Sequence, residues 1–108
     1  MNRGEVRWYT FRPPDKRRPV LILTRDSAIE VLTGITIAPI TSTIRHIPTE
    51  VTLLPAEDGI LTESAVNLDN LQTVQKAKIG RLITILSPHK MEAVERAICF
   101  ALGMDHLL

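Results

Sequence analysis

Apolar and polar residues alternate over short stretches near the start of the chain, a pattern typical of strands. Segment 5–11 (EVRWYTF) alternates until Pro13-Pro14 ends it. Segment 19–23 (PVLIL) is almost wholly apolar, which predicts a strand covered on both faces, with Pro tolerated at its first position. The sequence therefore predicts two strands here.

Two further segments, 34–41 (GITIAPIT) and 49–54 (TEVTLL), are rich in β-branched residues. The polar segment STIRHIP lies between them, so we expect a hairpin that pairs them as antiparallel neighbours. After a turn at Asp58-Gly59, the pattern predicts shorter strands at 64–68, 72–74 and 81–86. Strands at this spacing indicate a small barrel, closed or nearly closed.

The period changes near the C-terminus, where an amphipathic helix is predicted. Ser87 is a natural N-cap and Pro88 suits the first helical position. Apolar residues then recur three or four apart until Gly103, and they are expected to pack on the barrel: Met91, Val94, Ile98 and Ala101. On the opposite face Glu92 and Arg96 are spaced for an ion pair. The predicted fold class is mainly β with a C-terminal α-helix.

Length and composition favour a single soluble domain, residues 1–108, because 44% of the 108 residues are hydrophobic and 23% are charged. The longest uncharged stretch, 31–43, contains Thr, Gly and Pro, so no membrane span is expected. The N-terminal residues lack the features of a secretory signal. Cys99 is alone, which fits a reducing compartment, and we expect a cytoplasmic protein.

Charge is unevenly distributed although the net charge is only +1. Residues 1–25 hold seven of the thirteen Arg and Lys residues but only two of the twelve acids. This asymmetry predicts a local positive surface that attracts polyanions, although a solvated charged loop would give the same pattern.

Motifs of several enzyme classes are absent. The five glycines form no phosphate-binding loop, and neither HExxH, GxSxG nor an EF-hand loop occurs. His46, His89 and His106 lie far apart in the sequence, without the spacing of metal ligands. We therefore expect no metal site and no cofactor.

A basic cluster, Lys16-Arg17-Arg18, directly precedes the buried strand PVLIL. Because the chain enters the core here, at least one Arg should be held rigidly, and a fixed guanidinium offers forked donors to phosphate oxygens. The alternative is an ordinary charge that protects an apolar strand from aggregation.

A second cluster lies at the tip of the expected hairpin. It combines three hydroxyl groups with a cation and an imidazole: Thr41, Ser42, Thr43, Arg45 and His46. Hydroxyls can donate to phosphate oxygens, but they also cap backbone groups in turns, and His46 alone is more often a surface residue than a base.

These clusters and their surroundings resemble the MazF/PemK family of toxins. The matching segments are RGEV from Arg3, RPVLI from Arg18, PITS from Pro39, and ESAVNLDNLQTVQKAKIGRL over residues 63–82. Each motif is short, but their order and spacing extend over nearly the whole chain.

The resemblance implies a homodimer of SH3-like barrels of the MazF/CcdB type. It further implies a metal-independent, sequence-selective endoribonuclease that cleaves single-stranded mRNA through a 2′,3′-cyclic phosphate and is inhibited by a cognate antitoxin. The family's catalytic Arg and Thr fall on Arg18 and Thr41, and we expect these two to serve the scissile phosphate. The alternative is a CcdB-like gyrase-binding toxin or a non-catalytic interaction module of the same fold.

The connection between the first two strands is shorter than in many family members, where a longer loop helps to choose bases. Only RPPDKR joins Phe11 to Arg18. We expect Arg12, Lys16 and Arg17 to bind the RNA backbone instead, together with Ser42, Thr43, Arg45 and His46.

Overall fold

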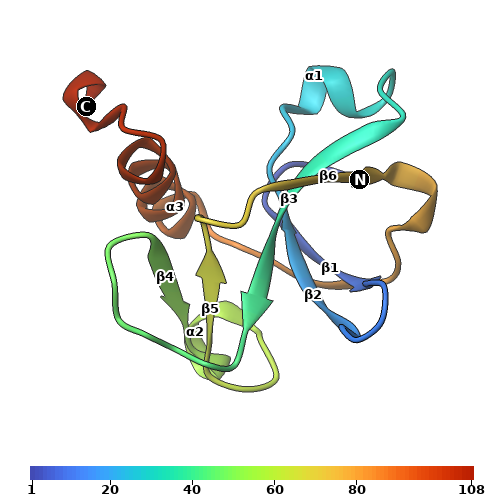
Figure 1. Ribbon diagram of the computed structural model, residues 1–108, viewed down its shortest axis with the longest axis horizontal. Helices are drawn as coiled ribbons and strands as arrows, with labels where there is room; N and C mark the ends of the chain where they lie inside the picture. The colour runs from blue at the N-terminus through green and yellow to red at the C-terminus, as the bar shows by residue number, and fades with distance from the viewer.

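The strands form one curled sheet with the shape of a half-barrel, and a C-terminal helix packs against one side of it (Figure 1). The computed structural model describes residues 1–108. Its strands are β1 (Glu5–Thr10), β2 (Arg17–Ile22), β3 (Gly34–Thr41), β4 (Glu50–Leu53), β5 (Ser64–Asn67), β6 (Gln72–Gln75) and β7 (Leu82–Ile85). The α-helices are α1 (Asp26–Ile29), α2 (Pro55–Asp58) and α3 (Pro88–Ala101), and Lys76–Lys78 and Asp105–Leu107 form 3₁₀ turns.

Strand β3 is the centre of the sheet, whose order is β4-β5-β3-β2-β1-β7. One edge of β3 pairs with β2. The other edge is shared, because its first half pairs with β6 and its last two residues pair with β5. The predicted mainly β fold with a C-terminal helix is confirmed.

Strand β2 is covered on both faces, as its apolar sequence predicts. Leu21 lies in a core cluster of 13 buried residues, whereas Val20 and Ile22 lie in a second cluster of six. The strand begins two residues earlier than predicted, since Arg17 and Arg18 continue the pairing with β1. Pro19 consequently lies inside the strand.

The predicted hairpin between 34–41 and 49–54 is wrong. Strand β5 lies between β3 and β4, because Val66 pairs with Ile40 on one side and with Val51 on the other. Residues 42–49 therefore cross from β3 past β5 to β4 instead of forming a hairpin tip. Within this crossover His46 adopts a left-handed backbone conformation, with φ of 55°.

Helix α3 begins as predicted, with the Ser87 Oγ accepting a hydrogen bond from the Lys90 N–H at 3.1 Å. Met91 and Val94 are buried in the larger core cluster, as the helical spacing predicts. The expected ion pair between Glu92 and Arg96 is not formed, and Glu95 instead pairs with Arg3 at 3.0 Å. No helix of the structure is both long and apolar enough to span a membrane.

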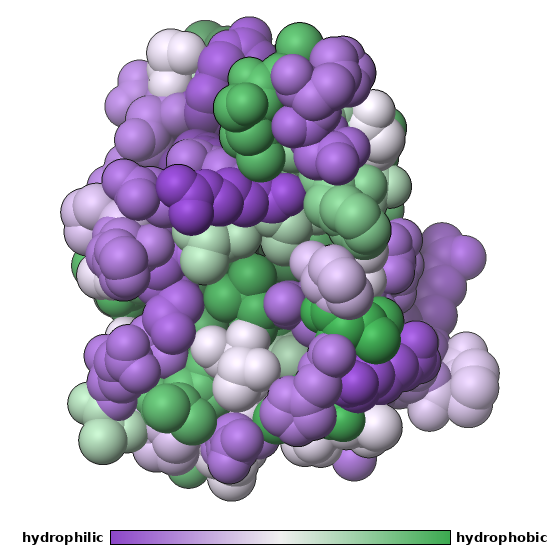
Figure 2. All heavy atoms as spheres, turned by 90° about the vertical axis from the view of Figure 1, so that its left-hand side faces the viewer, coloured by the Kyte–Doolittle hydropathy of each residue, from purple (hydrophilic) through white to green (hydrophobic).

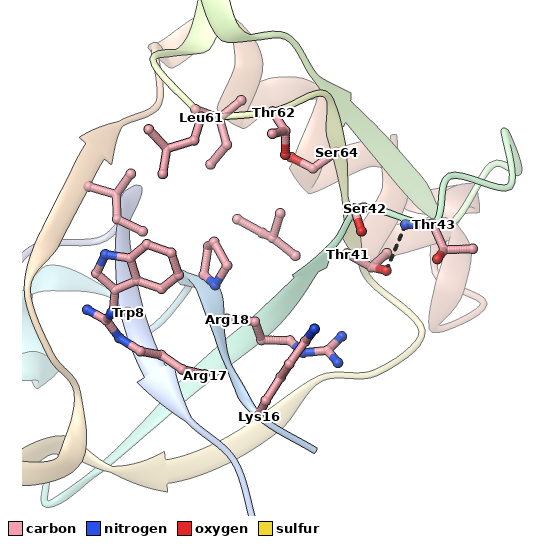
Figure 3. A pocket seen from close by; sticks show the side chains of 14 residues that line it. Trp8, Lys16, Arg17, Arg18, Thr41, Ser42, Thr43, Leu61, Thr62 and Ser64 are labelled. Carbon is pink, nitrogen blue, oxygen red and sulfur yellow. Dashed lines mark hydrogen bonds between the residues drawn. The ribbon is translucent and has the colours of Figure 1, made fainter. Parts of the chain in front are cut away.

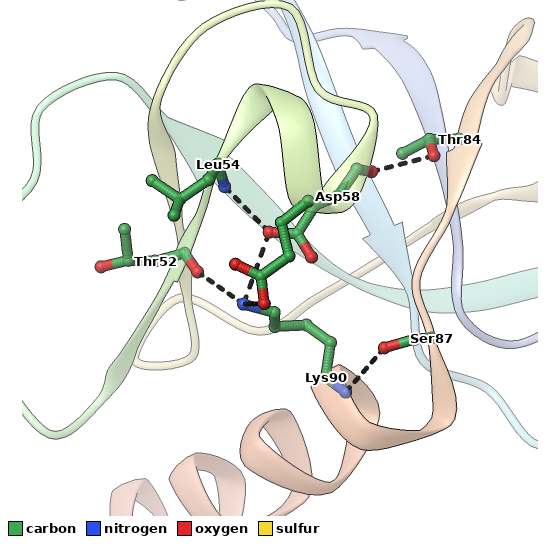
Figure 4. Close-up of polar contacts among 7 residues, drawn as sticks. Thr52, Leu54, Asp58, Thr84, Ser87 and Lys90 are labelled. Atoms are coloured by element: carbon green, nitrogen blue, oxygen red, sulfur yellow. Dashed lines mark hydrogen bonds and ion pairs between the residues drawn. The ribbon is translucent and has the colours of Figure 1, made fainter.

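The short helix α2 was not predicted, and a buried carboxylate fixes it (Figure 4). The Asp58 carboxylate accepts a hydrogen bond from the Leu54 N–H at 2.8 Å and lies 3.4 Å from the Lys90 Nζ. Lys90 also donates to the Thr52 carbonyl, and the Thr84 hydroxyl donates to the Asp58 carbonyl. These bonds tie α2 to α3, β4 and β7, and so fix the start of segment 60–64.

The face that carries α3 is mixed in character. Figure 2 shows apolar patches between polar side chains on this face. A shallow hollow of about 480 Å³ lies here, lined in part by Val51, Ala97, Phe100 and Leu108.

Candidate functional site

Arg18 and Thr41 belong to the neighbouring strands β2 and β3, and both residues line the same two hollows. The pairing of β2 with β3 ends at Val20 and Pro39, two residues short of Arg18 and Thr41. On its other edge Thr41 pairs with Ala65 of β5, so it lies at the middle of three strands.

Two hollows meet at this pair, because Arg18 and Thr41 line both of them. We call the first the large hollow, with a volume of about 490 Å³. It is lined by Trp8, Lys16, Arg17, Arg18, Pro19, Ile40, Thr41, Ser42, Thr43, Ile60, Leu61, Thr62, Ser64 and Ile83. We call the second the amide hollow, of about 170 Å³, which Phe11, Asp15, Pro39, Arg45, Asn67, Asn70 and Gln72 complete.

The walls of the large hollow differ in chemistry (Figure 3). Trp8 stands on one side, and the Arg17 guanidinium lies over its ring, 4.2 Å from the ring centre. The hydroxyl side chains of Thr41, Ser42 and Ser64 stand on the other side. No carboxylate lines this hollow, so its surface favours an anion with an adjoining apolar group.

The hydrogen bonding of Arg18 and Thr41 leaves donors free. Arg18 Nε is buried without a partner, and the closest carboxylate to the guanidinium is Asp15, at 3.7 Å from Nη2. The Thr41 Oγ1 accepts a hydrogen bond from the Thr43 N–H at 3.1 Å, so its own proton remains available. A guanidinium and a hydroxyl with free donors suit the oxygens of a phosphate.

The structure brings together six of the nine predicted site residues at the large hollow: Arg18, Thr41, Lys16, Arg17, Ser42 and Thr43. Arg45 lines the amide hollow instead. Arg12 and His46 are exposed and line neither hollow. No group of three His, Cys, Asp or Glu side chains is placed to hold a metal ion.

Several lining residues were not predicted from the sequence. They are the apolar Trp8 and Leu61, the hydroxyl of Ser64, and the amides Asn67, Asn70 and Gln72. Ser64 and the amides lie within the segment that carried the family resemblance, but nothing local to them indicates a binding role.

The fold and the site together define a class of protein. It is a small protein whose curled β-sheet presents the Arg18 guanidinium and the Thr41 hydroxyl between two hollows. A family model described as PemK-like, MazF-like toxin of type II toxin-antitoxin system matches residues 2–102. The chain belongs to this family, as the sequence predicts.

Relatives with known names support this assignment. The probable endoribonuclease MazF5 of Mycobacterium tuberculosis is 43% identical over 100 residues, which cover 93% of this chain and 87% of the relative. Endoribonuclease MazF3 of the same organism is 43% identical over 91 residues, covering 84% of this chain and 87% of the relative. These relatives are named as endoribonucleases, in agreement with the predicted activity.

Solved structures have the same fold. The M. tuberculosis toxin MazF-mt6 superposes with a TM-score of 0.84 and 39% identity, covering 94% of this chain and 98% of that one. An endoribonuclease in complex with its cognate antitoxin, from a mycobacterial species, gives a TM-score of 0.85 at 27% identity, covering 96% of each chain.

Proposed function

We propose that this toxin is an endoribonuclease that cleaves single-stranded RNA at the Arg18–Thr41 pair, without a metal ion. The observation that carries the proposal is the placement of Arg18 and Thr41, with free donors, at the junction of two hollows. With the phosphate on the pair, the strand on either side of the scissile bond lies beside one of the two hollows. A duplex would keep its bases paired and stacked, out of both hollows.

The reaction needs no nucleophile from the protein. The ribose 2′-oxygen attacks the adjacent phosphorus and loses its proton, while the bond from phosphorus to the 5′-oxygen breaks and that oxygen gains a proton. The products are a 2′,3′-cyclic phosphate and a 5′-hydroxyl. The protein must align the attack and stabilise charge on the non-bridging oxygens.

Arg18 and Thr41 suit these tasks. The guanidinium remains protonated near neutral pH and therefore acts by stabilising charge on the phosphate, not by removing a proton. The Thr41 proton can be donated to the same oxygens. The large hollow has no carboxylate and the amide hollow has only Asp15, which pairs with Arg18, so the pair lacks the cluster of carboxylates that Mg²⁺ prefers.

We propose two protein partners. The first is a cognate antitoxin whose acidic segment competes with RNA for Lys16, Arg17 and Arg18; related structures in complex with antitoxins support it. The second is another copy of the chain. Leu82 and Ile85 of the edge strand β7 are 41% and 63% exposed, and an exposed apolar edge strand favours pairing with another chain.

We place the toxin in the cytoplasm, where its mRNA substrate and its antitoxin are made. Size measurement by light scattering tests the dimer, with Ile85→Lys expected to shift the population toward monomer.

The chemistry is tested by the ends of the products. Fragments of a single-stranded RNA should resist extension at their 3′-ends until mild acid opens the cyclic phosphate and a phosphatase removes the resulting monoester. Their 5′-ends should accept label from polynucleotide kinase directly. Fragments with 5′-phosphates and free 3′-hydroxyls would contradict the mechanism.

A further inference from the structure

Ser64 is a buried hydroxyl without a hydrogen-bond partner. The residue is 4% exposed, and its Oγ is one of only two buried side-chain polar atoms in the chain that make no hydrogen bond. The other is the Arg18 Nε. Both residues line the large hollow, so the two unmet hydrogen-bonding groups lie at the same cavity.

An unpaired buried hydroxyl destabilises the free protein, because the group loses its hydrogen bonds to water and gains none within the protein. Ala at this position would avoid the cost, because it has no hydroxyl group that needs a partner. The hydroxyl is therefore unfavourable unless an occupant of the hollow supplies the missing partner. Since Oγ is covered in the free protein, it must turn toward that occupant by rotation about the Cα–Cβ bond.

The surroundings of Ser64 indicate which part of an RNA would supply the partner. In Figure 3 the cations Lys16, Arg17 and Arg18 lie along one edge of the hollow, whereas Ser64 lies at the opposite edge with Leu61 and Thr62. A phosphate belongs at the cationic edge. The opposite edge, apolar except for hydroxyls, suits a nucleobase, which has apolar faces and a polar rim.

We propose that the large hollow binds the nucleobase next to the scissile phosphate, and that the Ser64 hydroxyl bonds to the rim of this base and selects it. The proposal rests on the proposed function, because it takes the phosphate to lie on Arg18 and Thr41. Ser64 is then a specificity-determining residue and takes no part in the bond-breaking step.

The first test is Ser64→Ala, assayed by sequencing the fragments of a randomised single-stranded RNA. We expect the base preference at one position beside the cut to fall about tenfold, the equivalent of one hydrogen bond, with preferences elsewhere unchanged. The melting temperature should stay equal or rise, because the unmet hydroxyl is gone. Ser27→Ala, an exposed serine of α1 outside both hollows, is the matched control.

Three results would overturn the proposal. An unchanged preference at every position would show that Ser64 selects no base. An equal loss of rate for all sequences would indicate a contact to phosphate or sugar. A melting temperature lowered by several degrees would show that the hydroxyl has a partner within the protein.

A binding assay separates this proposal from the proposed function. Trp8 is the only tryptophan of the chain and lines the same hollow, so its fluorescence reports occupancy. Short RNAs with a 2′-deoxy substitution at the cut site should quench it in the wild type, with a preference for one base that Ser64→Ala removes. The fluorescence assay does not require cleavage. If the wild type cuts no RNA, a preference for one base in this assay still supports the base site, and binding without such a preference contradicts it.

Discussion

Replacing Lys90 by Met should destabilise the fold strongly, although Lys90 is not part of the site. Its side chain is 15% exposed, with Nζ 3.4 Å from the carboxylate of Asp58, whose side chain is 3% exposed. Without the lysine this buried carboxylate keeps only the Leu54 N–H as a donor. Met retains most of the apolar stem, so the substitution mainly removes the charge and its hydrogen bond to the Thr52 carbonyl.

Breaking a buried ion pair by removing one partner costs about 3–5 kcal/mol. The Glu57 carboxylate lies 3.8 Å from Nζ, but its side chain is 58% exposed, so its ion pair with Lys90 contributes little to stability. Because Nζ is close to the surface, water can reach the gap, and we expect about 3 kcal/mol for Lys90→Met. For a domain of this size, this corresponds to a fall in melting temperature of about 12 °C, at about 4 °C per kcal/mol.

The assay is urea unfolding at a fixed protein concentration, since self-association would shift the midpoint. Lys78→Met, at an exposed lysine without an ion pair, is the control and should change stability by less than about 0.5 kcal/mol. Asp58→Asn should lower the free energy of unfolding much less in the Lys90→Met variant than in the wild type. A loss below about 0.5 kcal/mol for Lys90→Met, or strictly additive costs, would refute the reasoning.

Further predictions concern the site. Thr41→Ala should slow cleavage at least ~10²-fold by removing a preorganised donor, and Arg18→Lys should fail similarly because an ammonium lacks the guanidinium fork; full activity in either variant would contradict these roles. His46→Gln should change the rate less than tenfold, since His46 lines neither hollow, and a pH profile abolished by this change would make it the base. Lys16→Ala and Arg12→Ala should each lower the salt dependence of RNA binding by ~0.7 in slope, the single-strand value per neutralised phosphate, and an unchanged slope would mean that the basic segment is only a solvated loop.

Sequence patterns correctly predicted those strands and helices whose formation depends on residues close together in the chain. The run PVLIL has no polar face, so its burial on both sides follows directly from the sequence. Ser87 and Pro88 predicted the start of α3 because capping depends on adjacent residues. The pairing of β3 with β5 could not be predicted in this way, because strands distant in sequence compete for the same edge.

The candidate site was predictable only in part. Arg18 and Thr41 were assigned through the family resemblance, and the structure places these residues, 23 positions apart in the sequence, at the junction of the same two hollows. Ser64 and Trp8 have the sequence pattern of ordinary strand residues. Their role depends on which hydrogen bonds remain unmet and which walls meet at one hollow, and only the tertiary structure determines both.

The most direct test of the account is cleavage of a single-stranded RNA by the purified chain in excess EDTA. We predict defined cuts by the wild type, a rate at least ~10²-fold lower for Arg18→Ala, and an unchanged rate for Arg25→Ala, an exposed arginine outside both hollows. Full activity of Arg18→Ala, or cleavage by the wild type only when a divalent cation is restored, would contradict the claim that Arg18 and Thr41 cleave RNA without a metal ion.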